Sequence, residues 1–181
     1  MAHHPKIPVR FQEEIKKVLG DNTLRSITYE DLEKFPYLDA IIKESQRIIP
    51  LAPLVPRTST QDSIIGGKHW EADTVFFVNQ EQLHKSSDCW KDPDQFIPER
   101  FLKESEHKIV KNSYLPFGGG IRICPGRHMA MVELKTLLIL LYRKYDVELV
   151  DKISKKPKIT FMAVNSCTEM KVIVRPKENI I

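Results

Sequence analysis

The sequence predicts a mixed α+β fold that is mainly α-helical and carries small β-sheets. Three segments repeat apolar residues at helical spacing, at residues 8–19, 37–48 and 127–144. Between and after them lie short runs of β-branched and aromatic residues, broken by glycine and proline, which are typical of short strands. The chain has 181 residues, 41% hydrophobic and 29% charged, as in an ordinary globular protein, so a single domain is expected.

The first helix is expected at residues 8–19. Phe11 and Leu19 fall on one apolar stripe, Pro8 suits a first turn, and Gly20 is placed to end the helix.

Two more helices should follow. Thr28 precedes acidic residues and is expected to cap a short helix that runs through Phe35. A longer helix is expected at residues 37–48, with Glu44 and Arg47 on its flank at a spacing that allows the two side chains to pair. Its apolar face should consist of Leu38, Ile41, Ile42, Ser45 and Ile49.

The middle of the chain reads as extended and turn-rich. Three prolines exclude a helix at residues 50–57, and residues 63–78 are expected to form short strands around a glycine turn. Residues 79–90 are expected to be rich in turns, with His84 as a hydrogen-bonded structural histidine.

The longest helix is expected at residues 127–144, where the apolar stripe is wide enough to predict burial on more than one side. The remainder should form strands at 147–149, 159–161 and 170–174, with a turn at 165–167.

Several classes of protein and site are not expected. The net charge is only +4 and no basic run is long enough to indicate nucleic-acid binding. Cys89, Cys124 and Cys167 lie far apart with no C-x-x-C, which argues against a disulfide framework or a zinc site. We find no signal peptide and no apolar run of about 20 residues that would span a bilayer.

Residues 117–126 stand out because they combine four glycines, an arginine and a cysteine. Glycine allows the backbone to approach a bulky ligand closely, and nearby N–H groups and a cation favour the thiolate form of Cys124. One cysteine suffices as the single axial ligand of a haem iron. By itself, this pattern also fits a small buried cysteine in a glycine-rich turn.

The spacing Phe-x-x-Gly-x-Arg-x-Cys-x-Gly in this segment resembles the cysteine-ligand loop of the cytochrome P450 family. The resemblance implies that Cys124 is the axial ligand of haem b. It also implies that Arg122 pairs with a haem propionate, that Phe117 packs against the proximal face of the ring, and that Gly120 and Gly126 permit a close turn.

Two further motifs agree with this resemblance in order and spacing. Glu44-x-x-Arg47 and Pro-Glu-Arg-Phe, which contains Arg100, imply a buried structural triad of Glu44, Arg47 and Arg100. Arg57 lies where many members of the family place a second propionate partner. The residues implied to line the substrate cavity, for which core packing is an equal alternative, are Leu51, Leu54 and Val55.

The resemblance implies a haem-thiolate monooxygenase that inserts one oxygen atom from O2 into a small apolar substrate, with electrons from an NADPH-dependent reductase. Residues 1–181 would form the C-terminal, haem-ligating part of the domain, from the region of helix J onward, without the oxygen-activating helix that turnover needs. A non-catalytic haem-binding or interaction fragment is the alternative. Full-length relatives are commonly found on the cytosolic face of the endoplasmic-reticulum membrane.

Overall fold

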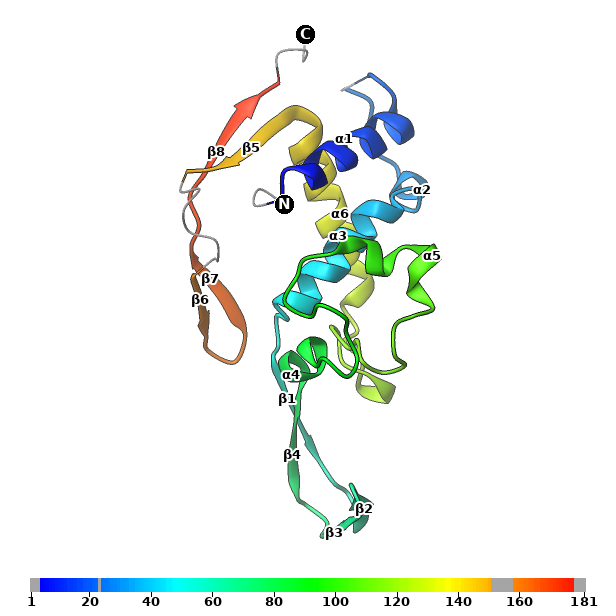
Figure 1. Cartoon of the computed structure of the whole chain (residues 1–181), viewed down its shortest axis with the longest axis vertical. Coiled ribbons are helices and arrows are strands. Elements are labelled where there is room, and N and C mark those ends of the chain that lie inside the picture. The colour runs from blue at the N-terminus through cyan, green and yellow to red at the C-terminus, as the bar shows by residue number, and fades with distance from the viewer. Residues whose placement is uncertain (1–3, 23, 151–157, 178–181) are drawn as a thin grey trace.

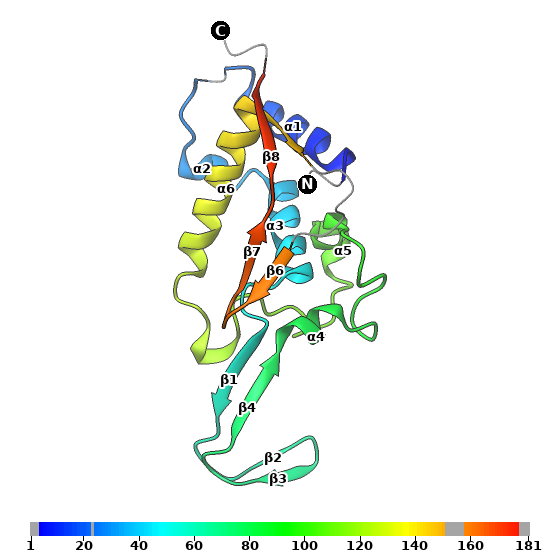
Figure 2. The ribbon, with the colours of Figure 1, turned by 90° about the vertical axis from the view of Figure 1, so that its left-hand side faces the viewer.

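The structure is a computed structural model that describes residues 4–22, 24–150 and 158–177. Its body is a group of helices in which α1 (Lys6–Leu19), α3 (Pro36–Ile48) and α6 (Arg127–Lys144) contact one another. Within these described ranges, four two-stranded antiparallel sheets accompany the helices (Figures 1 and 2). The predicted fold class, mixed α+β with mainly helices and small sheets, is confirmed.

Helix α1 forms as its apolar spacing predicts, beginning two residues before the predicted start. It buries Ile7, Phe11, Ile15 and Leu19 against the other helices, and Gly20 ends it with a φ of 72°. This left-handed conformation is accessible to glycine at little cost.

Helix α2 (Tyr29–Leu32) is shorter than predicted, because the chain leaves the helix before Phe35. Its start is as predicted: the Thr28 side chain accepts a hydrogen bond from the Asp31 N–H, and the Asp31 carboxylate accepts one from the Thr28 N–H, a capping box.

Helix α3 has the predicted bounds within one residue, but its buried face differs from the predicted one. Ser45 and Ile49 are exposed, whereas Glu44 and Arg47 are completely buried. Apolar periodicity could not reveal this, because the buried face of the helix includes an ion pair in place of apolar residues.

Strands β1 (Leu54–Thr58) and β4 (Val75–Asn79) pair to form an arm that extends from the helices (Figure 1). Beyond them lie β2 (Ser63–Ile65) and β3 (Lys68–Trp70). Gly66 and Gly67 make the connecting turn with φ values of 61° and 75°, which is the geometry that a two-residue hairpin requires. The predicted strands and glycine turn are confirmed.

The next segment is more helical than predicted. Helix α4 (Gln80–Lys85) begins where the Asn79 side chain accepts a hydrogen bond from the Gln82 N–H. A 3-10 turn at Pro98–Phe101 and the one-turn helix α5 (Lys103–Glu106) follow.

The C-terminal strands are β5 (Tyr145–Leu149) paired with β8 (Val172–Pro176), and β6 (Lys158–Phe161) paired with β7 (Asn165–Glu169). The turn predicted at residues 165–167 is wrong, since these residues lie in β7. The chain turns instead at residues 162–164, where Ala163 has a φ of 77°. No glycine or asparagine marks this turn in the sequence.

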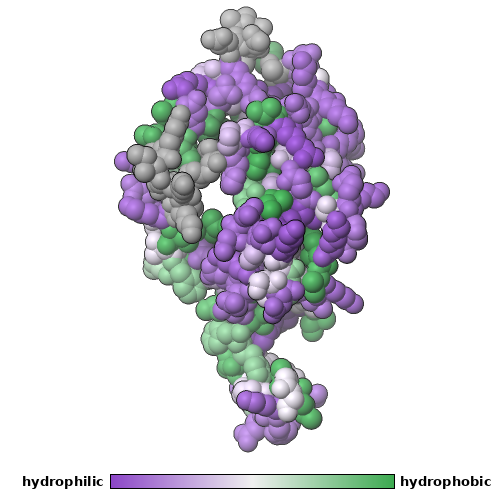
Figure 3. All heavy atoms as spheres, in the orientation of Figure 1, coloured by the Kyte–Doolittle hydropathy of each residue, from purple (hydrophilic) through white to green (hydrophobic). Residues whose placement is uncertain are grey.

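The bounds of α6 are as predicted, but the expected burial on more than one side is wrong for these residues. Only Ile139, Tyr142 and Arg143 are buried, while Met129 and Leu137 are 65% and 62% exposed. Exposed apolar side chains also gather on the β1/β4 arm, visible below the helices in Figure 3. Among the described residues, no helix combines the length and apolar character that a membrane span requires.

Candidate functional site

The cysteine loop, residues 117–126, connects a partly buried segment to the start of α6. Cys124 is exposed, and its N–H donates to the carbonyl oxygen of Phe117 at 2.9 Å. Within this closure, the Ile123 N–H donates to the Gly120 carbonyl oxygen at 3.2 Å. Backbone bonds therefore fold the loop on itself and leave the thiol at the surface.

The glycines of the loop differ in what they contribute. Gly118 and Gly120 have φ values of 76° and 66°, which favour glycine at both positions. Gly126, by contrast, has an ordinary φ of −78° as the residue before α6, and a Cβ there would lie 3.8 Å from the Cys124 sulfur. The backbone thus requires glycine at Gly118 and Gly120 but not at Gly126.

One arginine lies in the cysteine loop and a second lies beside it. A Cβ at Gly118 would come within 3.7 Å of Arg57 Nη2, so the guanidinium of Arg57 on β1 reaches the backbone of the cysteine loop. Arg122 is part of the loop and is exposed. The site therefore offers a thiol together with two cationic side chains that come from different elements.

The donor set fits a haem better than a metal ion held by protein ligands alone. Among the residues that the structure describes, no group of three or more histidine, cysteine, aspartate or glutamate side chains could hold a metal ion. A single exposed thiol can supply one axial ligand, and a porphyrin supplies the other four. Phe117 is half-buried, while Ile121 is fully exposed and Ile123 is exposed in part, so the loop also offers apolar surface.

Glu44 and Arg47 of α3 meet Arg100 of the 3-10 turn at Pro98–Phe101. Arg47 Nε lies 2.8 Å from Glu44 Oε2, and Arg47 Nη2 lies 2.9 Å from Glu44 Oε1, a two-pronged ion pair with both side chains 0% exposed. Arg100 Nε approaches Glu44 Oε1 at 3.4 Å. A partner missed in the sequence is the Ile97 N–H, which donates to Glu44 Oε1 at 2.8 Å.

Arg47 also holds the chain that follows the arm. Its Nη1 donates to the carbonyl oxygens of His84 and Pro93, both at 2.8 Å, and its Nη2 donates to that of Gln95 at 3.0 Å. Its guanidinium lies 5.1 Å from the ring centroid of Trp90, within the range of a cation–π interaction. The Arg47 guanidinium thus donates hydrogen bonds to acceptors on four different residues.

His84 is completely buried, and its ring lies 5.4 Å from that of Tyr114, centroid to centroid, in a tilted arrangement. Its Nε2 accepts a hydrogen bond from the Leu115 N–H at 2.9 Å, so in the neutral ring the proton sits on Nδ1. Burial, and then the positive charge of Arg47, lower the pKa of His84 to about 4, while the backbone of Gln46 acts in the opposite direction. His84 is therefore neutral at physiological pH.

Acidification from about pH 6.5 to about pH 4 is expected to lower the free energy of unfolding by about 2 to 3 kcal/mol through His84. The pKa is lower in the folded chain, so the unfolded chain takes up the proton first. The stabilisation is complete above pH 6.5 and is lost as the pH falls toward 4.

Urea unfolding across this pH range checks this expectation when the wild type is compared with His84→Gln, which removes the titrating ring. Carboxylates titrate equally in both proteins and cancel. Equal pH dependence of the two proteins would show that His84 does not carry the effect.

The three residues expected to line a substrate cavity are largely at the surface. Leu51 is 64% and Leu54 39% exposed, and Val55 is half-buried. The Leu51 carbonyl oxygen accepts a hydrogen bond from the Asn165 N–H at 2.7 Å, which places the start of β7 beside this segment. Residues far apart in sequence therefore meet here.

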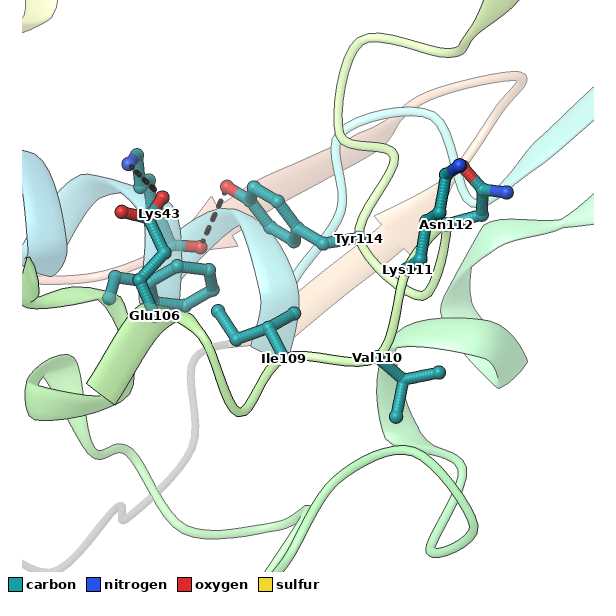
Figure 4. Close-up of a pocket in the computed structure, with 8 residues that line it drawn as sticks. Lys43, Glu106, Ile109, Val110, Lys111, Asn112 and Tyr114 are labelled. Atoms are coloured by element: carbon teal, nitrogen blue, oxygen red, sulfur yellow. Dashed lines mark hydrogen bonds and ion pairs between the residues drawn. The ribbon is translucent and has the colours of Figure 1, made fainter. Parts of the chain in front are cut away.

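A shallow hollow lies elsewhere, between α3 and the segment after α5 (Figure 4). Lys43 and Glu106 form an ion pair of 3.5 Å on its wall, and the hydroxyl of Tyr114 donates to the Lys43 carbonyl oxygen at 3.1 Å. The hollow contains none of the predicted site residues.

Comparison with known proteins identifies the family. A family model described as cytochrome P450 matches residues 1–174. The chain is 39% identical over 146 residues to cytochrome P450 71B22 of Arabidopsis thaliana, covering 78% of this chain and 29% of that protein. It is 36% identical over 184 aligned positions to the steroid 17-alpha-hydroxylase/17,20 lyase of Cavia porcellus, covering 97% of this chain and 35% of that protein.

Solved structures agree with the sequence comparison. The crystal structure of a cytochrome P450 (CYP102L1) superimposes with a TM-score of 0.88 at 25% identity, covering 97% of this chain and 39% of that one. The haem domain of cytochrome P450DA gives the same TM-score. The chain spans only about a third of the length of these relatives. The matched family model and the identity to its members show that the chain belongs to the cytochrome P450 family.

Proposed function

We propose that this chain is the haem-ligating part of a monooxygenase that inserts one oxygen atom from O2 into a small apolar organic substrate. The observation that carries the proposal is the exposed thiol of Cys124, in a loop closed by its own backbone bonds and flanked by Arg57 and Arg122. Membership of the cytochrome P450 family supports a monooxygenase function in general.

Proteins of this family bind haem b. When bound, haem supplies an iron centre to which a thiolate ligand donates electron density, which favours cleavage of the O–O bond. In our proposal the Cys124 sulfur is that ligand. The exposed loop backbone and the left-handed glycines Gly118 and Gly120 support a close approach of the chain to a flat ring.

The neighbouring side chains would hold the cofactor in place. We assign Arg57 and Arg122 to the haem propionates, because a guanidinium binds carboxylate oxygens through two parallel hydrogen bonds. Phe117 would pack against the proximal face of the ring, and Gly120 and Gly126 would leave room for it.

The other predicted residues are assigned either a structural role or apolar contact with the substrate. Glu44, Arg47 and Arg100 would fix the segment beneath the cysteine loop and take no part in the chemistry. The exposed side chains of Leu51 and Leu54, near the start of the arm, support contact with substrate, and we assign the half-buried Val55 to the same contact.

The remaining assignments concern the whole protein. We propose that residues 1–181 correspond to the C-terminal part of a cytochrome P450 domain, and that an NADPH-dependent reductase supplies the electrons. Coverage of only 29% to 35% of two relatives supports the view that oxidation of substrate belongs to a polypeptide of their full length.

A chimera tests the proposal. These 181 residues replace the matching segment of the Cavia porcellus relative, which shares 36% identity with them. Reduced under carbon monoxide, the chimera is expected to absorb at the wavelength that gives the family its name, because that band requires thiolate ligation. Haem retained with a band typical of a neutral axial ligand would contradict the proposal. Titration of the free chain with haem serves as the second measurement.

A further inference from the structure

We propose that His84 is a positioning residue for the cysteine loop: it fixes the backbone of Leu115, two residues before the loop begins. The inference deepens the proposed function and rests on it, because the position of the loop matters for function only if Cys124 has to meet a ligand. His84 lies on α4, 31 residues before Leu115 in the sequence.

Three hydrogen bonds connect the His84 ring to Cys124: one joins the ring to the backbone of Leu115, and two join backbone groups of the residues that follow. The Leu115 N–H donates to His84 Nε2 at 2.9 Å. The Leu115 carbonyl oxygen accepts the Gly118 N–H at 3.0 Å, and the Phe117 carbonyl oxygen accepts the Cys124 N–H at 2.9 Å. Displacement of Leu115 would therefore displace the turn that its carbonyl forms with Gly118. Through that turn it would also move Phe117, whose carbonyl accepts the hydrogen bond from Cys124.

His84 is itself held from the other side. Its carbonyl oxygen accepts from Arg47 Nη1 at 2.8 Å, and its ring packs against Tyr114. The Tyr114 hydroxyl is anchored on α3, where it lies 3.1 Å from the Lys43 carbonyl oxygen (Figure 4). It also lies 3.0 Å from Gln46 Oε1. His84 is thus held at its carbonyl by Arg47 of α3, and its ring lies against Tyr114, whose hydroxyl also contacts α3.

The chemistry of the contact explains why a histidine suits this place. Leu115 needs an acceptor for its partly buried N–H, and Nε2 of a neutral imidazole provides one. An apolar side chain of similar volume would fill the space but leave that N–H without a partner. Gln places an oxygen near the position of Nε2, whereas Asn is one bond shorter and does not reach it.

Amide hydrogen exchange on the 181-residue chain without haem tests the proposal. In His84→Leu, exchange at Leu115, Gly118 and Cys124 is expected to accelerate at least about tenfold, the effect of losing one buried hydrogen bond. Amides of α1 should be unchanged. His84→Gln should restore the protection. The control is Phe11→Leu, which trims a completely buried side chain of α1.

Phe11→Leu is expected to raise exchange in α1 and the loop alike, because it weakens the core as a whole. The proposal is overturned if His84→Leu gives that same uniform rise, or if His84→Gln fails to restore protection. If His84→Leu does not fold, His84→Asn replaces it, and equal protection of the loop in His84→Asn and His84→Gln overturns the proposal.

A second readout keeps this proposal apart from the proposed function. Exchange on the haem-free chain does not depend on whether Cys124 binds iron. In the haem-loaded chimera, His84→Leu should shift part of the ferrous carbon-monoxide band away from the thiolate position, and His84→Gln should return it. Absence of a thiolate band in the unaltered chimera would count against the proposed function alone.

Discussion

Replacement of Cys124 by serine is expected to abolish the thiolate band of the ferrous carbon-monoxide complex in the haem-loaded chimera. A serine hydroxyl is not ionised at neutral pH and cannot donate electron density to iron as a thiolate does. Absorption spectra of the reduced protein, with and without carbon monoxide, measure the change. Cys124→His should likewise remove the band, because a neutral imidazole replaces the thiolate.

The matched control is Cys167→Ser. Cys167 is also exposed but lies on β7, in a different element from the loop, and its replacement should leave the band unchanged. A thiolate band that persists in Cys124→Ser, or that vanishes in Cys167→Ser, would show that the ligand has been assigned to the wrong cysteine.

Glu44→Ala is expected to lower the free energy of unfolding by about 3 to 5 kcal/mol, since it leaves the fully buried guanidinium of Arg47 without its counter-charge. The backbone N–H of Ile97 would lose its acceptor as well. Urea unfolding of the 181-residue chain measures the loss, and haem retention in the chimera should fall with it.

Glu30→Ala provides the comparison for Glu44→Ala. Glu30 is an exposed residue in the first turn of α2, so the same chemical change there removes no buried partner. Unfolding midpoints that fall equally in the two variants would mean that the Glu44 ion pair does not stabilise the fold.

Elements whose structure depends on local sequence could be predicted closely. Apolar spacing with a glycine stop gave α1, and α6 has the predicted bounds. The glycine pair at Gly66 and Gly67 correctly indicated the hairpin turn. In each case the signal and the structure lie within one short stretch of chain.

What could not be predicted depends on contacts between distant residues or on irregular backbone. The helix α4 is six residues long and too short for a clear apolar period. The left-handed Ala163 makes a turn that no residue preference reveals. At the site, motif spacing indicated Glu44 and Arg47, but the Leu115 contact of His84 is visible only in three dimensions.

The exposed apolar side chains of α6 have a related explanation. A wide apolar stripe predicts that something covers it, and sequence periodicity does not say whether the cover belongs to the same stretch of chain. Met129 and Leu137 lie uncovered by the residues that the structure describes.

The guanidinium of Arg47 joins α3 to carbonyl oxygens that lie 37, 46 and 48 residues further along the chain. When the first of these carbonyls binds Arg47, it closes a long loop, and this closure costs chain entropy. The other two carbonyls then lie nearby and bind with little further loss of chain entropy. We therefore expect residues 84–95 to dock onto α3 in one cooperative step.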